Sequence, residues 1–69
     1  MSIRESYEQW WAAIRPPNPP AVQTEECKRA FYAGAQSFFV LAMELAELPD
    51  EQAEAGMQRF EDELGAYFK

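Results

Sequence analysis

The longest apolar segment of the chain runs from Ala30 to Ala46 and reads AFYAGAQSFFVLAMELA. Only Gln36, Ser37 and Glu44 interrupt it with polar side chains. A helix that is apolar around most of its circumference needs more than one neighbour to cover it. The segment has too many interruptions to be a membrane span. It therefore predicts a central helix that packs on other parts of the chain, on copies of the chain or on a target.

The N-terminal segment has the pattern of a short amphipathic helix. Ser2 and Glu5 are spaced as a capping box, in which both side chains satisfy unpaired backbone amides. The apolar residues that follow are spaced by four and then three positions: Ile3, Tyr7, Trp10 or Trp11, and Ile14. We expect a helix over about 3–14. The prolines of PPNPP (16–20) end it and form a stiff, polyproline-like linker.

The second predicted helix covers about 24–48, with Thr24 as its cap and Pro49 as its end. Two apolar stripes run along it. The first contains mostly large side chains: Cys27, Phe31, Gly34, Phe38, Leu41, Leu45 and Leu48. The second lies one residue further round and is mostly small: Lys28, Tyr32, Ala35, Phe39, Ala42 and Ala46. Small side chains let another backbone approach closely, so two usable faces on one helix predict self-association.

The third predicted helix covers about 50–68. Pro49 suits its first turn, and Asp50 and Glu51 follow where the helix dipole favours acids. Its apolar stripe is Ala53, Met57, Phe60, Leu64 and Tyr67. The short link before it predicts an antiparallel helical hairpin with the second helix. We expect Phe31, Phe38, Leu41 and Leu45 to face the core of this hairpin. The oligomer interface is expected at Ala35, Phe39, Ala42 and Ala46.

No segment has the period-two pattern of a strand, so the expected fold class is all-α, as one domain over residues 1–69. A chain of 69 residues has a marginal core, and small domains usually add a disulfide, a metal or a partner chain. Cys27 is the only cysteine and there is no histidine, so we expect no disulfide, no metal and no cofactor. Oligomerisation remains as the source of added stability. The lone cysteine fits a reducing compartment.

The net charge of −6 lies entirely in the last third of the chain. Residues 1–43 carry four acids and four bases, whereas residues 44–69 carry eight acids against Arg59 and Lys69. Direct nucleic-acid binding by this third is therefore disfavoured. The acidic face either meets a basic surface on a partner protein or keeps an oligomer soluble.

Catalytic chemistry has no candidate set in this sequence. The carboxylates of Glu61, Asp62 and Glu63 point about 100° apart on a helix and do not converge. Cys27 has no histidine to activate it and is interpreted as a small buried residue. We expect no enzymatic activity. The N-terminus lacks the pattern of a secretory signal, and a cytoplasmic location is expected.

Five residues are the candidates for ligand or partner binding: Trp10, Trp11, Lys28, Arg29 and Tyr32. Tryptophan, tyrosine and arginine are the preferred anchors of interfaces. Lys28 and Tyr32 are one helical turn apart, an arrangement that suits a nucleotide, with phosphate on the cation and base on the ring. The alternative is structural: a tryptophan covers the hairpin and Tyr32 fills a helix contact.

The segment VQTEECKRAFYAGA (22–35) resembles a pattern of small uncharacterised accessory proteins of tailed bacteriophages. In that pattern a proline-rich turn precedes Cys-[Lys/Arg]-Arg-Ala-Phe-Tyr-Ala-Gly-Ala, and the chain ends in an acidic helix. Counted together with the proline-rich turn and the acidic helix, the match covers about half of the chain. The resemblance implies an accessory protein that acts in the cytoplasm of the bacterial host. Many phage proteins of this size bind a host or immune protein stoichiometrically, or sequester a nucleotide signal.

Three functions remain open from the sequence. The leading hypothesis is a non-catalytic, homo-oligomeric phage protein that inhibits a bacterial host or anti-phage defence protein by occupying its surface. The second is an oligomeric sponge that holds a cyclic nucleotide between protomers through Lys28, Arg29 and Tyr32. The third is a structural or assembly protein of the virion. No membrane partner is expected.

Overall fold

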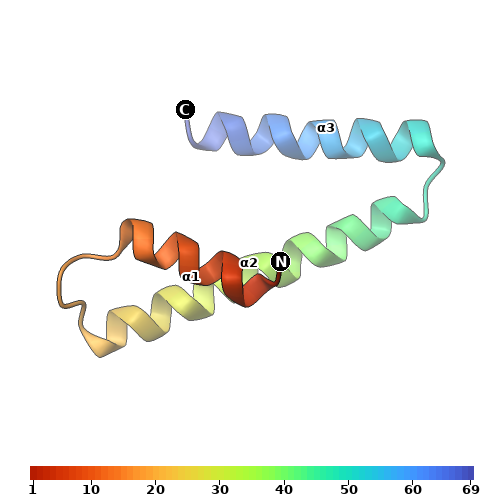
Figure 1. The fold of residues 1–69 in the computed structure, drawn as a ribbon. Helices are drawn as coiled ribbons and strands as arrows, with labels where there is room; N and C mark the ends of the chain where they lie inside the picture. Colours follow the sequence, from red (N-terminus) through yellow and green to blue (C-terminus); the bar gives the residue numbers. More distant parts are fainter. The chain divides into compact units, whose positions relative to one another are not determined.

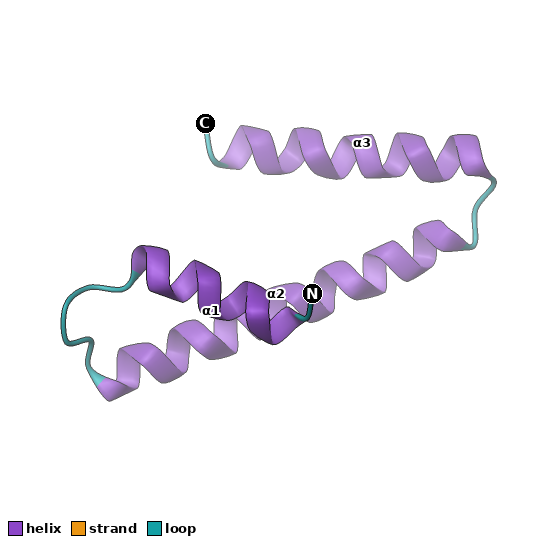
Figure 2. Cartoon of the chain, viewed as in Figure 1, coloured by secondary structure: helices purple, strands orange, loops and turns teal.

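The structure is a computed structural model that describes all residues from 1 to 69, and it consists of three helices without a strand (Figures 1 and 2). The helices are α1 (Ile3–Ile14), α2 (Ala21–Ala46) and α3 (Asp50–Tyr67). The expected all-α fold class is thus confirmed. None of the three helices combines the length and the apolar character needed to cross a membrane.

Helix α1 has the bounds that its apolar spacing predicts. Ser2 precedes it in extended conformation, and its hydroxyl accepts a hydrogen bond of 3.0 Å from the backbone N–H of Glu5. Arg15 returns to extended geometry at the other end, because the residue before a proline disfavours helical angles. Asn18 then adopts a left-handed conformation with φ of 53°, which asparagine tolerates better than most residues. The linker is therefore bent at Asn18 within its run of prolines.

Helix α2 begins at Ala21, three residues before the expected start, so the prediction of Thr24 as its cap is wrong. Pro20 lacks an N–H but keeps its carbonyl, which accepts the backbone N–H of Thr24 at 3.0 Å. The Thr24 hydroxyl donates to the same carbonyl at 3.2 Å, a bond typical of threonine inside a helix.

Helix α2 also ends early, at Ala46, where residues up to Leu48 were expected. The N–H groups of Glu47 and Leu48 bond to carbonyls only three residues back, at 3.3 and 3.0 Å, so the last turn tightens. Pro49 then enforces the break. Helix α3 starts directly afterwards with Asp50 and Glu51 in its first turn, and it ends one residue before the expected end.

The chain forms two compact units, Met1–Ser37 and Phe38–Lys69. The N-terminal unit contains α1 and the first part of α2, which lie side by side in Figure 1. The C-terminal unit contains the last part of α2 and α3. The large stripe of α2 is thus divided between two partners. Phe31 packs on Tyr7 and Trp10 of α1, although the sequence predicted it in the core of the hairpin with α3. Phe38 contacts Phe60 of α3, in agreement with the prediction.

The core of each unit is thin. Tyr7, with 7% of its surface exposed, is the only buried large side chain in the N-terminal unit. In the C-terminal unit the buried residue is Gly56, which lies against Leu45 of α2. A Cβ atom built on Gly56 would overlap Cδ2 of Leu45 and lie 3.2 Å from Cδ1. The absence of a side chain at Gly56 therefore allows this close contact between α3 and α2.

Candidate functional site

Five aromatic rings form a cluster in the N-terminal unit, which we call the aromatic cluster: Tyr7, Trp10, Trp11, Phe31 and Tyr32. Tyr7 lies at its centre, with ring centroids 5.5 Å from Phe31, 5.9 Å from Tyr32 and 6.2 Å from Trp10. Trp10 is also 5.2 Å from Phe31, and Trp11 joins at the edge, 6.2 Å from Trp10. The tilted and edge-on geometries are the ones that aromatic pairs prefer. The cluster holds α1 on α2.

Three of the five predicted binding residues, Trp10, Trp11 and Tyr32, belong to the aromatic cluster. Both tryptophans are half-buried, and Tyr32 is 36% exposed. Tyr7 and Phe31 were not predicted as members, because their spacing on each helix is that of ordinary core residues. No single-helix pattern reveals that rings on two helices meet. The meeting depends on the linker that reverses the chain between them.

The two predicted cations differ in their surroundings. The ammonium of Lys28 lies 5.9 Å from the centroid of the Tyr7 ring, within the range of a cation–π contact. The aromatic partner of Lys28 is thus Tyr7 on the neighbouring helix, where Tyr32 on its own helix was considered. Arg29 is exposed and forms no ion pair, since the one salt bridge of the chain joins Arg4 to Glu8 at 3.6 Å. Arg29 is therefore free to bind an anion.

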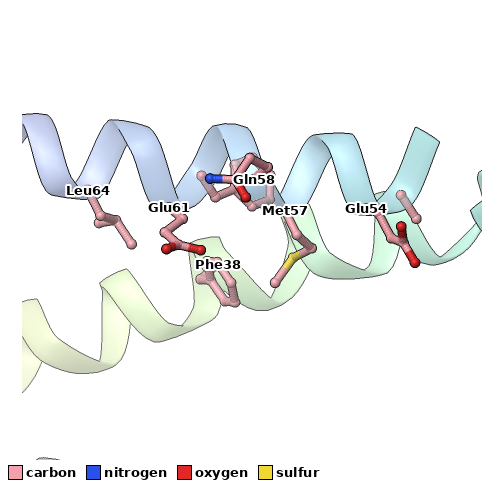
Figure 3. A pocket seen from close by; sticks show the side chains of 8 residues that line it. Phe38, Glu54, Met57, Gln58, Glu61 and Leu64 are labelled. Atoms are coloured by element: carbon pink, nitrogen blue, oxygen red, sulfur yellow. The ribbon is translucent and has the colours of Figure 1, made fainter. Parts of the chain in front are cut away.

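A second surface lies in the C-terminal unit, and we call it the α3 groove. It is an open groove with a volume of about 470 Å³. Its lining residues are Phe38, Ala53, Glu54, Met57, Gln58, Phe60, Glu61 and Leu64. Phe38 is the contribution of α2, and its ring packs edge-on against Phe60 at 5.8 Å. In Figure 3 the side chains of Met57 and Leu64 extend from α3 toward the side on which Phe38 lies.

The floor of the α3 groove is apolar and its rim is polar. Phe38, Met57 and Leu64 are 42%, 47% and 54% exposed, so water reaches the floor. Glu54 and Glu61 contribute carboxylates, and no salt bridge forms in this unit. Met57 and Leu64 belong to the apolar stripe predicted for the third helix. The acidic face was predicted either to meet a basic surface on a partner or to stay solvated. The available signal was the seven-residue spacing of Glu54 and Glu61, which sets both on one side of α3.

The four predicted oligomer residues fall into two pairs. Ala35 and Ala42 are half-buried within the chain itself. Phe39 is 60% exposed and Ala46 is exposed. Further large side chains of α2 are exposed beside Phe39, namely Val40 at 50% and Met43 at 54%. This outward face of α2, with Phe39, Val40 and Met43, is available for a partner.

Reactive chemistry is sparse in the structure. No three His, Cys, Asp or Glu side chains come together in an arrangement that could hold a metal ion. Cys27 is a half-buried free thiol. No protein-family model, curated protein or solved structure matches the chain. The surfaces themselves therefore carry the functional argument.

Proposed function

We propose that the chain is a non-catalytic phage protein that inhibits a bacterial host or anti-phage defence protein by stoichiometric binding in the host cytoplasm. The observation that carries this proposal is the number of large apolar side chains left exposed on α2 and α3. Phe39, Val40, Met43, Met57 and Leu64 are each at least 47% exposed. Exposed apolar side chains that gather on one surface are typical of binding sites. The resemblance of residues 22–35 to phage accessory proteins supports the biological setting.

Self-association belongs to the same proposal. We expect helical hairpins of α2 and α3 to pair through the outward face of α2, at Phe39, Val40 and Met43, with Ala46 beside them. A chain with a single buried large side chain in its N-terminal unit gains stability when a second copy covers such a face. The half-buried Ala35 and Ala42 then support the helix packing from within.

The test of inhibition is a pull-down from bacterial lysate with the folded protein as bait. We expect one host protein at a fixed stoichiometry, and loss of its activity when the purified chain is added at an equimolar amount. The control bait carries Met57→Gln and Leu64→Gln, two substitutions at exposed positions that leave helix propensity nearly unchanged. Absence of any stoichiometric partner for the wild-type bait, or a partner whose activity does not change, contradicts the proposal.

A second candidate is an oligomeric sponge for a cyclic nucleotide, and it is favoured by one observation. Arg29 is an exposed cation without an ion pair, and the Tyr32 ring further along the same helix is 36% exposed. A phosphate on Arg29 and a base on Tyr32 would use both groups. Against it, Lys28 is already engaged with Tyr7, and the net charge of −6 repels anions.

Melting experiments separate the two candidates. A nucleotide that binds only the folded state raises the melting temperature. The sponge predicts such a rise with cyclic di- or trinucleotides and its loss in Arg29→Gln. The inhibitor predicts an unchanged melting temperature with every nucleotide at large excess. The matched control is Arg15→Gln, which removes the same charge just before the linker.

A further inference from the structure

We infer that the α3 groove binds a basic amphipathic helix of the target protein, an inference that rests on the proposed function and names the chemistry of its partner. The groove combines an apolar floor with an acidic rim on the most negative part of the chain. A helix with apolar residues on one face and lysine or arginine beside them matches both features.

The floor supplies the apolar half of the match. Met57, Phe60 and Leu64 follow one another at the three- and four-residue spacing of one helix face, and Phe38 closes the groove from α2 (Figure 3). Side chains of a docked helix repeat at the same spacing, so they interdigitate with this floor. Methionine adapts its shape to different partners, which favours it in grooves of this kind.

The rim supplies the charged half. Glu54 and Glu61 lie two turns apart on the same side of α3. Glu54 stands before Met57 at one end of the floor, and Glu61 lies between Met57 and Leu64 (Figure 3). Gln58 lies between them, and its amide donates to Asp62 at 3.0 Å. No salt bridge engages any acid of the C-terminal unit, which holds eight acids and two bases. The rim carboxylates are therefore available for lysine or arginine of a partner.

A second copy of the chain is a poor occupant of this groove. In a symmetric dimer each surface meets the same surface of the other copy. The carboxylates of Glu54 and Glu61 would then face an equally acidic rim, and like charges brought together weaken association. The four bases of the N-terminal unit are matched by four acids, so the chain has no net basic helix of its own to offer.

The test uses a designed helical peptide of 18 residues, the length of α3, with leucine on one face and lysine beside it. Isothermal titration calorimetry measures its affinity for the full chain. Replacing both rim acids, in Glu54→Gln with Glu61→Gln, should weaken binding about 2- to 30-fold, since exposed ion pairs contribute about 0.2–1 kcal/mol each. The affinity of the wild type should fall with rising salt.

The matched control replaces Glu51 and Glu63 by glutamine, because these acids belong to the same helix but do not line the groove. Its affinity for the peptide should stay close to that of the wild type. A second variant, Met57→Gln, changes the floor and should weaken binding without changing the salt dependence. An equal loss in the control and the rim variant overturns the inference, because binding then follows net charge alone. Absence of peptide binding at millimolar concentration also overturns it.

The pull-down separates this inference from the proposed function. A stoichiometric inhibited partner that binds the rim variant as tightly as the wild type removes the groove and leaves the proposed function intact. Peptide binding that depends on Glu54 and Glu61, together with no inhibited host partner, keeps the groove and removes the proposed function. A change of oligomeric mass in Met57→Gln identifies a second copy as the occupant and overturns the inference.

Discussion

The two units of this chain solve the problem of a small core in different ways. The N-terminal unit carries no net charge and packs its large side chains on one another, with Tyr7 surrounded by four partners from two helices. The C-terminal unit carries the whole net charge of −6 and leaves much of its apolar surface in contact with water. The first unit packs its aromatic rings on one another, while Ile3, Ile14 and Val22 stay exposed. The second leaves most of its large apolar side chains exposed.

We propose that the two units have separate tasks. Aromatic rings provide a large contact area per residue, so a short α1 suffices to stabilise the first part of α2. The acids and exposed apolar residues of α3 contribute little to stability, and they are well suited to binding. Substitutions that act on one unit and leave the other unchanged test this division.

The largest effect is expected at the centre of the aromatic cluster. Tyr7→Ala should lower the free energy of unfolding by about 3–5 kcal/mol, because it removes a buried aromatic side chain. Phe38→Ala in the C-terminal unit should cost only about half as much, since Phe38 is 42% exposed. Urea titrations followed by circular dichroism measure both values. Tyr7→Phe, which keeps the ring, is the control and should change little. Equal losses for Tyr7→Ala and Phe38→Ala would falsify the division between the units.

A smaller effect is expected on the outward face of α2. Phe39→Glu should weaken self-association by about 2 kcal/mol, as charge replaces an apolar anchor at an interface. Helix content should stay the same, because Phe39 is 60% exposed. Light scattering after size exclusion gives the mass, and circular dichroism gives the helix content. Val22→Glu makes the same charge change at an exposed site of the N-terminal unit and should leave the mass unchanged. A wild-type chain that stays monomeric at micromolar concentration contradicts this prediction.

Two glycines of α3 provide a matched pair. A methyl group added at Gly65 would meet no atom within 4 Å, so Gly65→Ala should stabilise the chain by about 1 kcal/mol through helix propensity. Gly56→Ala gains the same propensity but displaces the Leu45 side chain, so it should be less stable than Gly65→Ala by about 1–3 kcal/mol. Thermal unfolding of the two variants measures this difference. Equal stabilisation would mean that Leu45 moves aside without cost.

The smallest effects concern charges at helix ends. Helix α2 has no basic residue in its last turn, where the dipole favours one, and Glu44 stands there instead. Glu44→Lys should therefore stabilise the chain by about 0.3–1 kcal/mol. Glu5→Lys places the same charge change in the first turn of α1 and should destabilise by a similar amount. Both shifts should shrink in high salt. Shifts of the same sign in thermal unfolding would contradict the dipole explanation.

The helices themselves follow from the sequence, because capping residues, prolines and apolar spacing are local signals. Ser2 and Arg15 bound α1 as predicted. The start of α2 cannot be predicted from the sequence in the same way. The carbonyl of Pro20 can accept the first hydrogen bond of the helix, and the hydroxyl of Thr24 could equally cap a helix that starts later. The composition of Ala21 to Thr24 does not decide between the two.

The packing partners along α2 do not follow from its periodicity. Phe31 and Phe38 lie on the same stripe, and periodicity alone cannot tell that one meets α1 and the other α3. The choice depends on the lengths of α1 and of the linker, which set how far along α2 the first helix reaches. The α3 groove was missed for a related reason. Exposure of Met57 and Leu64 depends on how much of α3 the short end of α2 can cover.

Both tryptophans of the chain lie in α1, and the C-terminal unit contains none. Their emission therefore reports the N-terminal unit alone, whereas the helical signal in the far ultraviolet arises from both units. The ring centroids of Trp10 and Phe31 are 5.2 Å apart, so the emission spectrum of Trp10 changes when α1 separates from α2. The chain thus carries a built-in optical probe for one of its halves. Comparing the two signals during unfolding reveals whether the halves melt as one cooperative body or in sequence.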